Sequence, residues 1–442
     1  MAIHVADAGM DIQYTPKVSR TFAWIVFALT FGLLISDYMS RQVLNAVFPV
    51  LKAEWGLSDT QLGSLNSIVA LLVGLLTFPL SVVADRWGRV RSIVVMATLW
   101  SLATLACALA ESYGQMLTAR FFVGVGEAAY GSVGIALILS VFPPHLRSSL
   151  SGAFMAGGAV GSVLGMALGG IISAHLGWRW AFGAMALFGM ALVFLYAIIV
   201  TEKRLAAGDP TPQQARKANG NDRAGFRSLR SLFAGLFSSP SVICAYVGSG
   251  LQLFIMAAMI AWLPSYVNRY YGLPTDKAGL VAAVFVLLGA IGMTGCGMIT
   301  DRFSRNFAVR KWTIAMTYSV LSCALLLIGF QLPIGTAQLV FLGAGMLLVA
   351  GTTGPACAMV ANLTHPSIHA TAFATLTLVN NLLGLAPGPF VTGMIADRTG
   401  LLGALQIAPL IALAAAVAFA IGRKHYDRDL QRIRALQAAG KN

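Results

Sequence analysis

The sequence predicts an all-α membrane protein with twelve transmembrane helices in two pseudo-symmetric six-helix bundles. The first reason is composition: of the 442 residues 57% are hydrophobic and 10% are charged, and the mean hydropathy is +0.77. Soluble domains carry about 25% charged residues. The second reason is a series of twelve apolar segments, and the third is a short pattern that recurs along the chain.

Each apolar segment is long enough to cross a bilayer of ~30 Å as a helix that rises ~1.5 Å per residue. No small-residue cleavage site follows the first one, so we expect no secretory signal peptide. The segments lie near residues 22–50, 59–84, 91–110, 114–142, 148–174, 179–200, 239–270, 276–300, 312–332, 336–363, 369–395 and 402–422.

The basic residues are distributed unevenly over the loops between these segments. With a cytoplasmic N-terminus, 23 of the 30 Lys and Arg residues fall in cytoplasmic tails and loops, and cytoplasmic loops carry such an excess. We therefore expect both termini in the cytoplasm, in a bacterial inner membrane. The net charge of +14 indicates membrane topology rather than a nucleic-acid partner.

One long polar break, rich in Pro, Gln and basic residues, divides the chain into halves. The expected parts are a cytoplasmic N-terminal tail, a six-helix bundle, a cytoplasmic linker, a second six-helix bundle and a cytoplasmic C-terminal tail. Their boundaries are 1–21, 22–200, 201–238, 239–422 and 423–442.

The recurring pattern occurs four times, at Ser81–Gly88, Gly170–Gly177, Gly297–Ser304 and Gly393–Gly400. It indicates a unit of three helices used four times. Because three is odd, successive units insert with opposite orientation, which is the inverted-repeat architecture of alternating-access transporters. Such proteins bind substrate near the membrane midplane, where the halves meet.

Two opposite charges interrupt the apolar run Arg120–Tyr130. Arg120 and Glu127 are seven residues apart, about two helical turns, so they share one helix face. A charge at the centre of a membrane helix costs roughly 2.5 to 3.5 kcal/mol on insertion scales, so such residues mark substrate or proton paths. On the first segment, Asp37 and Arg41 are positioned to interact one turn apart.

These four side chains form a cluster of zero net charge when all are ionised. Apolar surroundings oppose ionisation of the carboxyl groups, whereas the arginines favour it, so substrate arrival can change their protonation. We expect Glu127, with Asp37, to carry a proton, and Arg120 or Arg41 to attract an anionic group. The alternative is a permanently paired salt network that only specifies helix packing.

Further substrate contacts are expected from uncharged side chains. The second half carries no charge in its helix interiors. The adjacent amides of Asn380 and Asn381 precede two prolines, which suggests a broken, cavity-facing helix. The remaining candidates for substrate binding are Asn45, Tyr130 and Gln252.

The segment Ser81–Arg91 resembles the GxxxDRxGRxx(R/K) signature of the major facilitator superfamily, and Gly297–Arg305 repeats it. This resemblance implies the major facilitator fold. It also implies that the motif Asp pairs with cationic groups and helix ends on the cytoplasmic face and holds the outward-open state. The gate residues by this similarity are Asp85, Arg86, Arg89, Asp301 and Arg302.

Two branches of the superfamily are similar. Arg120–Tyr130, Leu57–Gln61 and Asp37–Arg41 resemble the spinster-like branch, which exports lysolipid-like and sphingolipid-like molecules. The Arg and Gly-Glu-Ala of the fourth segment, with Gly177–Phe182, also resemble the anion:cation symporters that import organic acids. Both branches commonly carry Asn-Tyr-x-Asp-Arg in the first helix, but here Ser40 replaces the Asp of that motif.

Other classes of protein are disfavoured. No nucleophile–base arrangement, Gly-rich phosphate loop or ATP-binding motif is present, so we expect neither an enzyme nor a primary pump. A channel would need a continuous polar lining, which the second half lacks. The five cysteines lie in apolar segments without CxxC spacing, and we expect no cofactor and no metal site.

The expected function is therefore proton-coupled secondary transport of a small organic anion, a carboxylate, by alternating access, with symport as the expected mode and a monomer as the unit. The alternative is a spinster-like exporter of a lysolipid-like or other amphiphilic molecule.

Overall fold

The computed structural model describes residues 19–143, 146–206, 237, 239–305, 307–364 and 368–439, and these residues form helices and their connections, without a strand. Eleven of the described helices are long and apolar enough to span a membrane. The last, Thr371–Arg432, has 62 residues and is broken at Gly400, where φ is 79° and ψ is 159°. This backbone conformation favours glycine. The break divides the segment into two crossings, so the predicted all-α fold with twelve crossings is confirmed.

The two bundles follow one another along the chain, and α4 with α5, like α14 with α15, forms a single interrupted crossing. The N-terminal bundle consists of α1 Arg20–Trp55, α2 Asp59–Trp87, α3 Arg89–Ala108, α4 Tyr113–Glu127, α5 Tyr130–Val141, α6 Arg147–Leu176 and α7 Trp178–Ile199, followed by the short α8 Glu202–Ala206. The C-terminal bundle consists of α11 Pro240–Tyr271, α12 Thr275–Ser304, α13 Arg310–Gln331, α14 Thr336–Ala350, α15 Thr353–Asn362, α16 His369–Asn380, η4 Asn381–Leu385, α17 Pro387–Ile407, η5 Ala408–Leu410 and α18 Ile411–Ala439.

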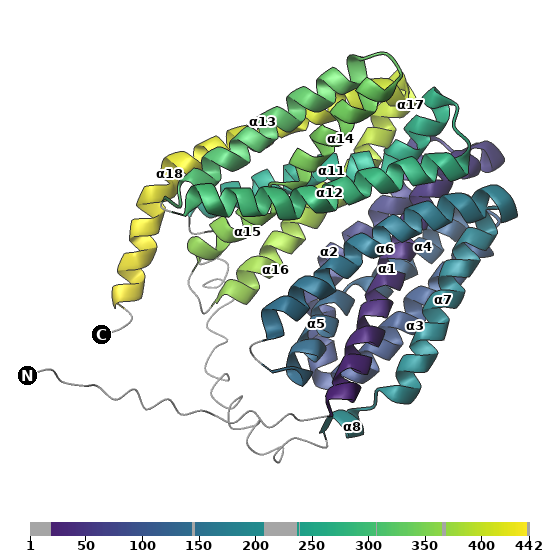
Figure 1. Cartoon of the computed structure of the whole chain (residues 1–442), viewed down its shortest axis with the longest axis horizontal. Coiled ribbons are helices and arrows are strands. Elements are labelled where there is room, and N and C mark those ends of the chain that lie inside the picture. Colours follow the sequence, from purple (N-terminus) through teal and green to yellow (C-terminus); the bar gives the residue numbers. More distant parts are fainter. Residues whose placement is uncertain are drawn as a thin grey trace, which may run out of the picture.

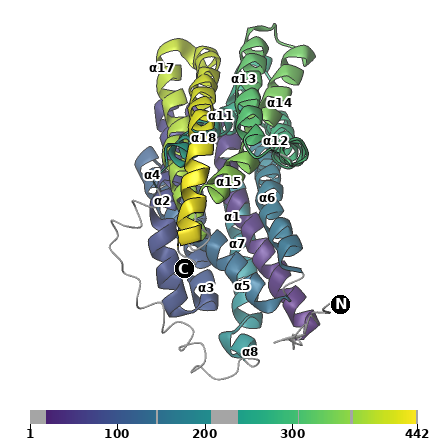
Figure 2. The same ribbon diagram turned by 90° about the vertical axis from the view of Figure 1, so that its left-hand side faces the viewer.

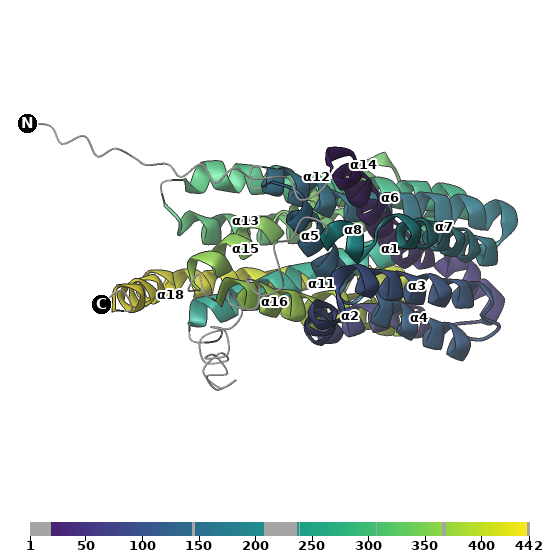
Figure 3. The same cartoon turned by 90° about the horizontal axis from the view of Figure 1, so that it is seen from below.

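The chain alternates between two faces of the molecule. We call the face where α1 and α11 begin and α18 ends the tail face, and the opposite face the loop face. Figures 1 and 2 show the two bundles packed against each other, the first in purple to teal and the second in green to yellow. Across the boundary α6 packs on α12, α2 on α17 and α1 on α11. Figure 3 shows α6 beside α12 and α1 beside α11 from below.

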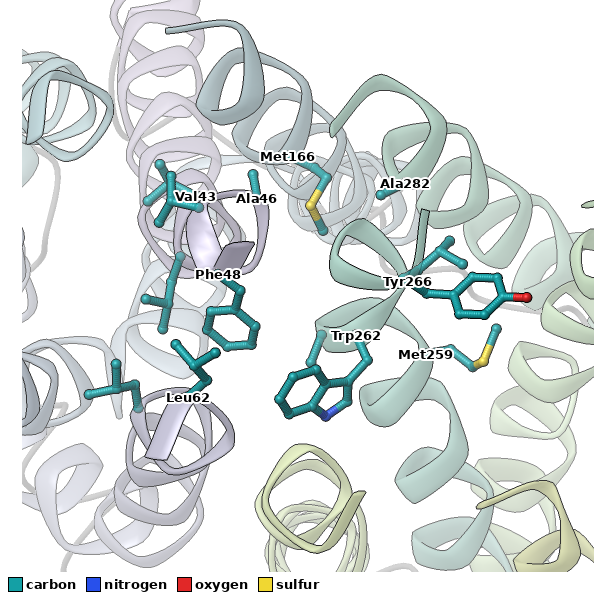
Figure 4. Close-up of a cluster of buried hydrophobic side chains, with 14 of the residues drawn as sticks. Val43, Ala46, Phe48, Leu62, Met166, Met259, Trp262, Tyr266 and Ala282 are labelled. Atoms are coloured by element: carbon teal, nitrogen blue, oxygen red, sulfur yellow. The ribbon is translucent and has the colours of Figure 1, made fainter. Parts of the chain in front are cut away.

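The boundary between the bundles, which we call the seam, is closely packed toward the loop face. Phe48 of α1 and Trp262 of α11 are fully buried, with ring centroids 5.4 Å apart, and they face each other across the seam (Figure 4). The indole of Trp262 donates a hydrogen bond to the carbonyl of Pro389 at 3.0 Å. At Gly63 an added Cβ would lie 2.4 Å from that carbonyl, so the backbones of α2 and α17 are nearly in contact.

Glycines also bring α6 against α1 inside the first bundle. At Gly161 an added Cβ would lie 2.5 Å from the carbonyl oxygen of Ile35, and at Gly165 it would lie 2.7 Å from the backbone of Met39. Small residues at every fourth position permit this approach of two membrane helices.

The eleventh crossing is interrupted where the paired asparagines predicted a break. The turn η4 is π-helical, and the N–H of Ala386 donates to the carbonyl of Asn381 at 2.9 Å, five residues back. Such turns are frequent at functional sites. Against it packs α2, where an added Cβ on Gly74 would lie 2.7 Å from the Cβ of Asn381.

The last helix continues beyond the apolar segment expected to end at residue 422, and α18 runs to Ala439. Asp429 in this extension is buried, and its Oδ2 accepts hydrogen bonds from Ser239 Oγ at 2.7 Å, Ser241 N at 3.0 Å and Ser241 Oγ at 2.6 Å. The extension therefore holds the beginning of α11. The expected N-terminal tail and linker lie mostly outside the described residues.

Candidate functional site

The structure brings three of the four predicted charges together in the first bundle. Arg41 Nε donates to Asp37 Oδ1 at 3.2 Å and lies 2.7 Å from Glu127 Oε2. We call Asp37, Arg41 and Glu127 the charge triad. The Arg41 side chain is 20% exposed, whereas those of Asp37 and Glu127 are 3% and 0% exposed. Arg41 is therefore the member that an incoming solute can reach.

The fourth charge, Arg120, takes a different place. It is fully buried, and its described partners are two backbone carbonyls: Nε donates to Leu65 O at 3.2 Å and Nη1 to Ser40 O at 3.1 Å. Its Nη2 is buried without a hydrogen-bond partner among the described residues. In this state Arg120 ties α4 to α1 and α2.

Glu127 is the last residue of α4, at the interruption before α5. Two side chains that are not among the predicted site residues also lie here. The Ser40 hydroxyl donates to Glu127 Oε1 at 3.1 Å, and Thr77 Oγ1 donates to the carbonyl of Ala128 at 2.7 Å. Ser40 stands at the position of the Asp in the Asn-Tyr-x-Asp-Arg motif of the two similar branches, and this resemblance points to its place beside Glu127.

The exposed side of the triad faces the seam. Arg41, Asn45 and Phe48 are spaced by four and three residues, so they share one face of α1, and Phe48 packs on Trp262 of the other bundle. Arg41 therefore lies about two turns from the closed seam toward the tail face. Asn45 is buried, its Nδ2 donates to Gln42 Oε1 at 2.7 Å, and its Oδ1 has no described partner.

The other predicted substrate contacts are distributed over both bundles. Gln252 of α11 is buried, with neither amide atom hydrogen-bonded among the described residues. Asn381 is buried and donates to Thr377 O at 2.9 Å, whereas Oδ1 of Asn380 is buried without a described partner. Tyr130 is fully buried, and its hydroxyl donates to Thr30 O at 2.5 Å.

The predicted gate residues lie at the tail face without a described contact across the seam. Asp85, Arg86 and Arg302 are exposed. Arg89 Nη1 donates to Ala136 O at 3.1 Å inside the first bundle, and Asp301 Oδ1 lies 3.6 Å from Lys311 Nζ inside the second.

The charge triad can couple two binding events. One guanidinium between two carboxylates leaves one excess negative charge when all three groups are ionised, and uptake of one proton removes it. An anion that approaches Arg41 competes with the carboxylates for the same cation. Among the described residues, no group of three His, Cys, Asp or Glu side chains is arranged to hold a metal ion.

Twelve membrane crossings in two bundles, with a buried charge triad beside the seam, define a polytopic membrane transporter. The family model described as the Major Facilitator Superfamily matches residues 30–386, and the chain belongs to that superfamily. It is accordingly a transporter and not an enzyme.

Two curated relatives and one solved structure illustrate the range of similar proteins. The hexuronate transporter of Bacillus subtilis is 24% identical over 402 residues, covering 89% of this chain and 92% of that one. Protein spinster homolog 1 of Xenopus laevis is 23% identical over 410 residues, covering 89% and 76%. A crystal structure of a bacterial homolog of the human lysosomal transporter spinster matches with a TM-score of 0.80 and 19% identity, covering 93% and 99%.

Proposed function

We propose that this protein is a proton-coupled secondary transporter of a small organic anion, a carboxylate, and that it works by alternating access with Glu127 and Asp37 as the proton-carrying groups. The observation that carries the proposal is the position of Arg41 between these two carboxylates, with only the guanidinium partly exposed.

The coupling follows from competition for one cation. A substrate carboxylate that binds Arg41 weakens its attraction to Glu127 and Asp37. A carboxylate that loses its cationic partner in an apolar environment favours the protonated state. Substrate and proton therefore load together, and symport is the expected mode.

The membrane orientation is proposed from the charges. Among the described residues, the tail face carries most of the Lys and Arg residues, and we assign it to the cytoplasm of a bacterial cell. The structure, closed at the loop face, then corresponds to the inward-facing state.

We assign binding of the uncharged end of the substrate to the amide side chains near the seam. Gln252, Asn45 and Asn380 have buried polar atoms without described partners, and a buried amide that lacks a hydrogen bond costs free energy. Substrate hydroxyl groups would supply the missing bonds, which favours a hydroxylated acid, and the hexuronate transporter among the relatives supports this choice.

The test is uptake into proteoliposomes under an imposed pH gradient, with labelled glucuronate as the first probe. We expect Glu127→Gln to abolish accumulation of the probe while exchange of labelled for unlabelled probe persists, because exchange needs no net proton movement. The matched control is Glu54→Gln, whose carboxylate lies on α1 outside the triad and pairs with Arg179 at 2.9 Å. Undiminished accumulation in Glu127→Gln would contradict the proton assignment.

A second candidate function is export of a lysolipid-like amphiphile, and one observation favours it. A cavity of about 400 Å³ lies between α1, α6 and α7, lined by apolar side chains that include Ile35, Leu164 and Phe188. An acyl chain fits such a lining. Thermal stabilisation of the purified protein by lysophosphatidylcholine but not by glucuronate would favour this function over the first.

A further inference from the structure

A second polar network, at the loop face, joins the two bundles. The carboxylate of Asp397, on α17, contacts the first turn of α2. It accepts hydrogen bonds from Asp59 N at 2.7 Å, Thr60 N at 2.9 Å and Thr60 Oγ1 at 2.5 Å. The first N–H groups of a helix have no partner within the helix, and a carboxylate there is stabilising.

The remaining donor of this turn is satisfied locally. Gln61 N donates to Ser58 Oγ at 3.1 Å, and Ser58 N donates to Gln61 Oε1 at 3.0 Å, which is a capping box. The cap of a helix in the first bundle is therefore completed by an acid from the second bundle. Separation of the bundles removes that part of the cap.

The side chain of Asp59 makes the second connection across the seam. Arg269 of α11 binds it with both terminal nitrogens, Nη1 to Oδ2 at 2.9 Å and Nη2 to Oδ1 at 2.6 Å, and Lys52 Nζ lies 2.7 Å from Oδ1. Asp59 is buried. Paired, bidentate contacts between ionised groups are among the stronger hydrogen bonds in proteins.

The internal repeat relates Asp397 to Asp85. Both are the acid of the recurring pattern, near the ends of α2 and of the α16–α17 crossing, and these two crossings pack antiparallel across the seam. Both acids are exposed. In this state Asp397 caps α2 at the loop face, whereas Asp85 has no described hydrogen bond or ion pair at the tail face. The N-cap residue of α16, Ile368, makes no side-chain hydrogen bond to the first turn of that helix.

We propose that Asp397 and Asp59 form a latch that holds the loop face closed. Asp397 accepts hydrogen bonds from the beginning of α2, and Asp59 accepts them from Arg269, so each bundle supplies a carboxylate that is bonded by the other. When the bundles rock, the latch opens. The resemblance of Ser81–Arg91 to the superfamily signature implies that Asp85 then binds helix ends on the tail face, and Asp397 opposes it at the loop face. Asp397 thus sets the balance between the two states without contacting the substrate.

The test measures access to the seam in purified full-length protein and needs neither substrate nor a proton gradient, so its result is independent of the proposed function. Ala282 of α12 is buried at the seam near Met166 of α6 (Figure 4), and Ala282→Cys provides a reporter thiol. The rate of its reaction with a bulky polyethylene glycol maleimide is followed by gel shift. The same protein without the reporter supplies the background from the native cysteines.

We expect Asp397→Asn to accelerate labelling of the reporter about tenfold, the effect of losing hydrogen bonds to a charged group. Arg269→Gln should act in the same direction, and it serves as the second variant if Asp397→Asn does not fold. Glu54→Gln is the control, because its partners Arg179 and Trp178 belong to the same bundle. Labelling of both latch variants at the rate of the unchanged protein, or equal acceleration by the control, would overturn the latch.

The opposition between Asp397 at the loop face and Asp85 at the tail face is tested by the double variant Asp85→Asn, Asp397→Asn. We call this opposition the exchange. Loss of Asp85 removes the competing cap, so labelling should slow again toward the rate of the unchanged protein. A purely structural role for Asp397 does not give this reversal. A double variant that labels as fast as Asp397→Asn would overturn the exchange.

Discussion

At the scale of single residues, two arginines of the first bundle take different roles because their hydrogen-bond partners differ. Arg41 and Arg120 both lie at membrane depth. Arg41 meets carboxylates, whereas Arg120 meets two carbonyl oxygens. Arg120 therefore ties helices together through their backbones, whereas Arg41 holds two acids within reach of a solute.

The contacts of Arg120 predict a stability defect. Arg120→Lys keeps the charge but cannot reach both carbonyls in the planar geometry of a guanidinium. Loss of one or two buried hydrogen bonds costs about 1–3 kcal/mol each, so we expect a lower thermal unfolding temperature in detergent. Arg398→Lys, at an exposed position, is the control. An unchanged unfolding temperature for Arg120→Lys would indicate that these bonds contribute little.

The sequence could predict the members of the charge triad but not all of its contacts. The spacing of Asp37 and Arg41 is a local property of a helix, so their pairing was predictable. That Arg120 and Glu127 share a face was predictable too. Which of them meets Arg41 depends on where α4 ends and how α1 and α2 pack on it, and no local spacing contains that information.

At the scale of elements, the approach of α6 to α1 depends on the absence of side chains. Gly161→Ala would place a Cβ 2.5 Å from the carbonyl of Ile35, and the backbones must move apart. Overpacking of this kind costs about 1–3 kcal/mol. We expect a lower unfolding temperature and weaker transport.

The same helix provides the control for this prediction. Gly152→Ala adds a methyl group with no atom within 4 Å, and alanine favours a helix over glycine by about 1 kcal/mol. It should leave the unfolding temperature unchanged or raise it. Equal effects of the two substitutions would show that the close approach is not required.

At the scale of the whole molecule, the bundles are joined by a seam and not only by the chain between them. The seam includes the pairs α6–α12 and α2–α17, the buried rings of Phe48 and Trp262, and the latch. We therefore expect fragments 1–206 and 239–442, expressed together, to assemble in the membrane. Copurification through a tag on one fragment measures this. Recovery of the tagged fragment alone would show that the seam is too weak.

The architecture of the molecule could be predicted from the sequence, but the conformational state, closed at the loop face, could not. The apolar segments predict twelve crossings, the basic loops predict their orientation, and the repeat predicts two halves. The closed face was not predictable, because the same residues build both states. Asp397 could be identified from the sequence as the acid of the recurring pattern. Its partners could not, because Asp59 and Thr60 lie 338 and 337 residues away.

The polar end of α18 has a practical consequence for anyone who makes this protein. Asp429 accepts three hydrogen bonds from Ser239 and Ser241, at the beginning of α11. A chain shortened at the last apolar residue of α18 would lose these bonds, and the first turn of α11 would no longer be held in place. Affinity tags and fluorescent fusions belong beyond Ala439, and deletions made to aid crystallisation should stop short of this helix.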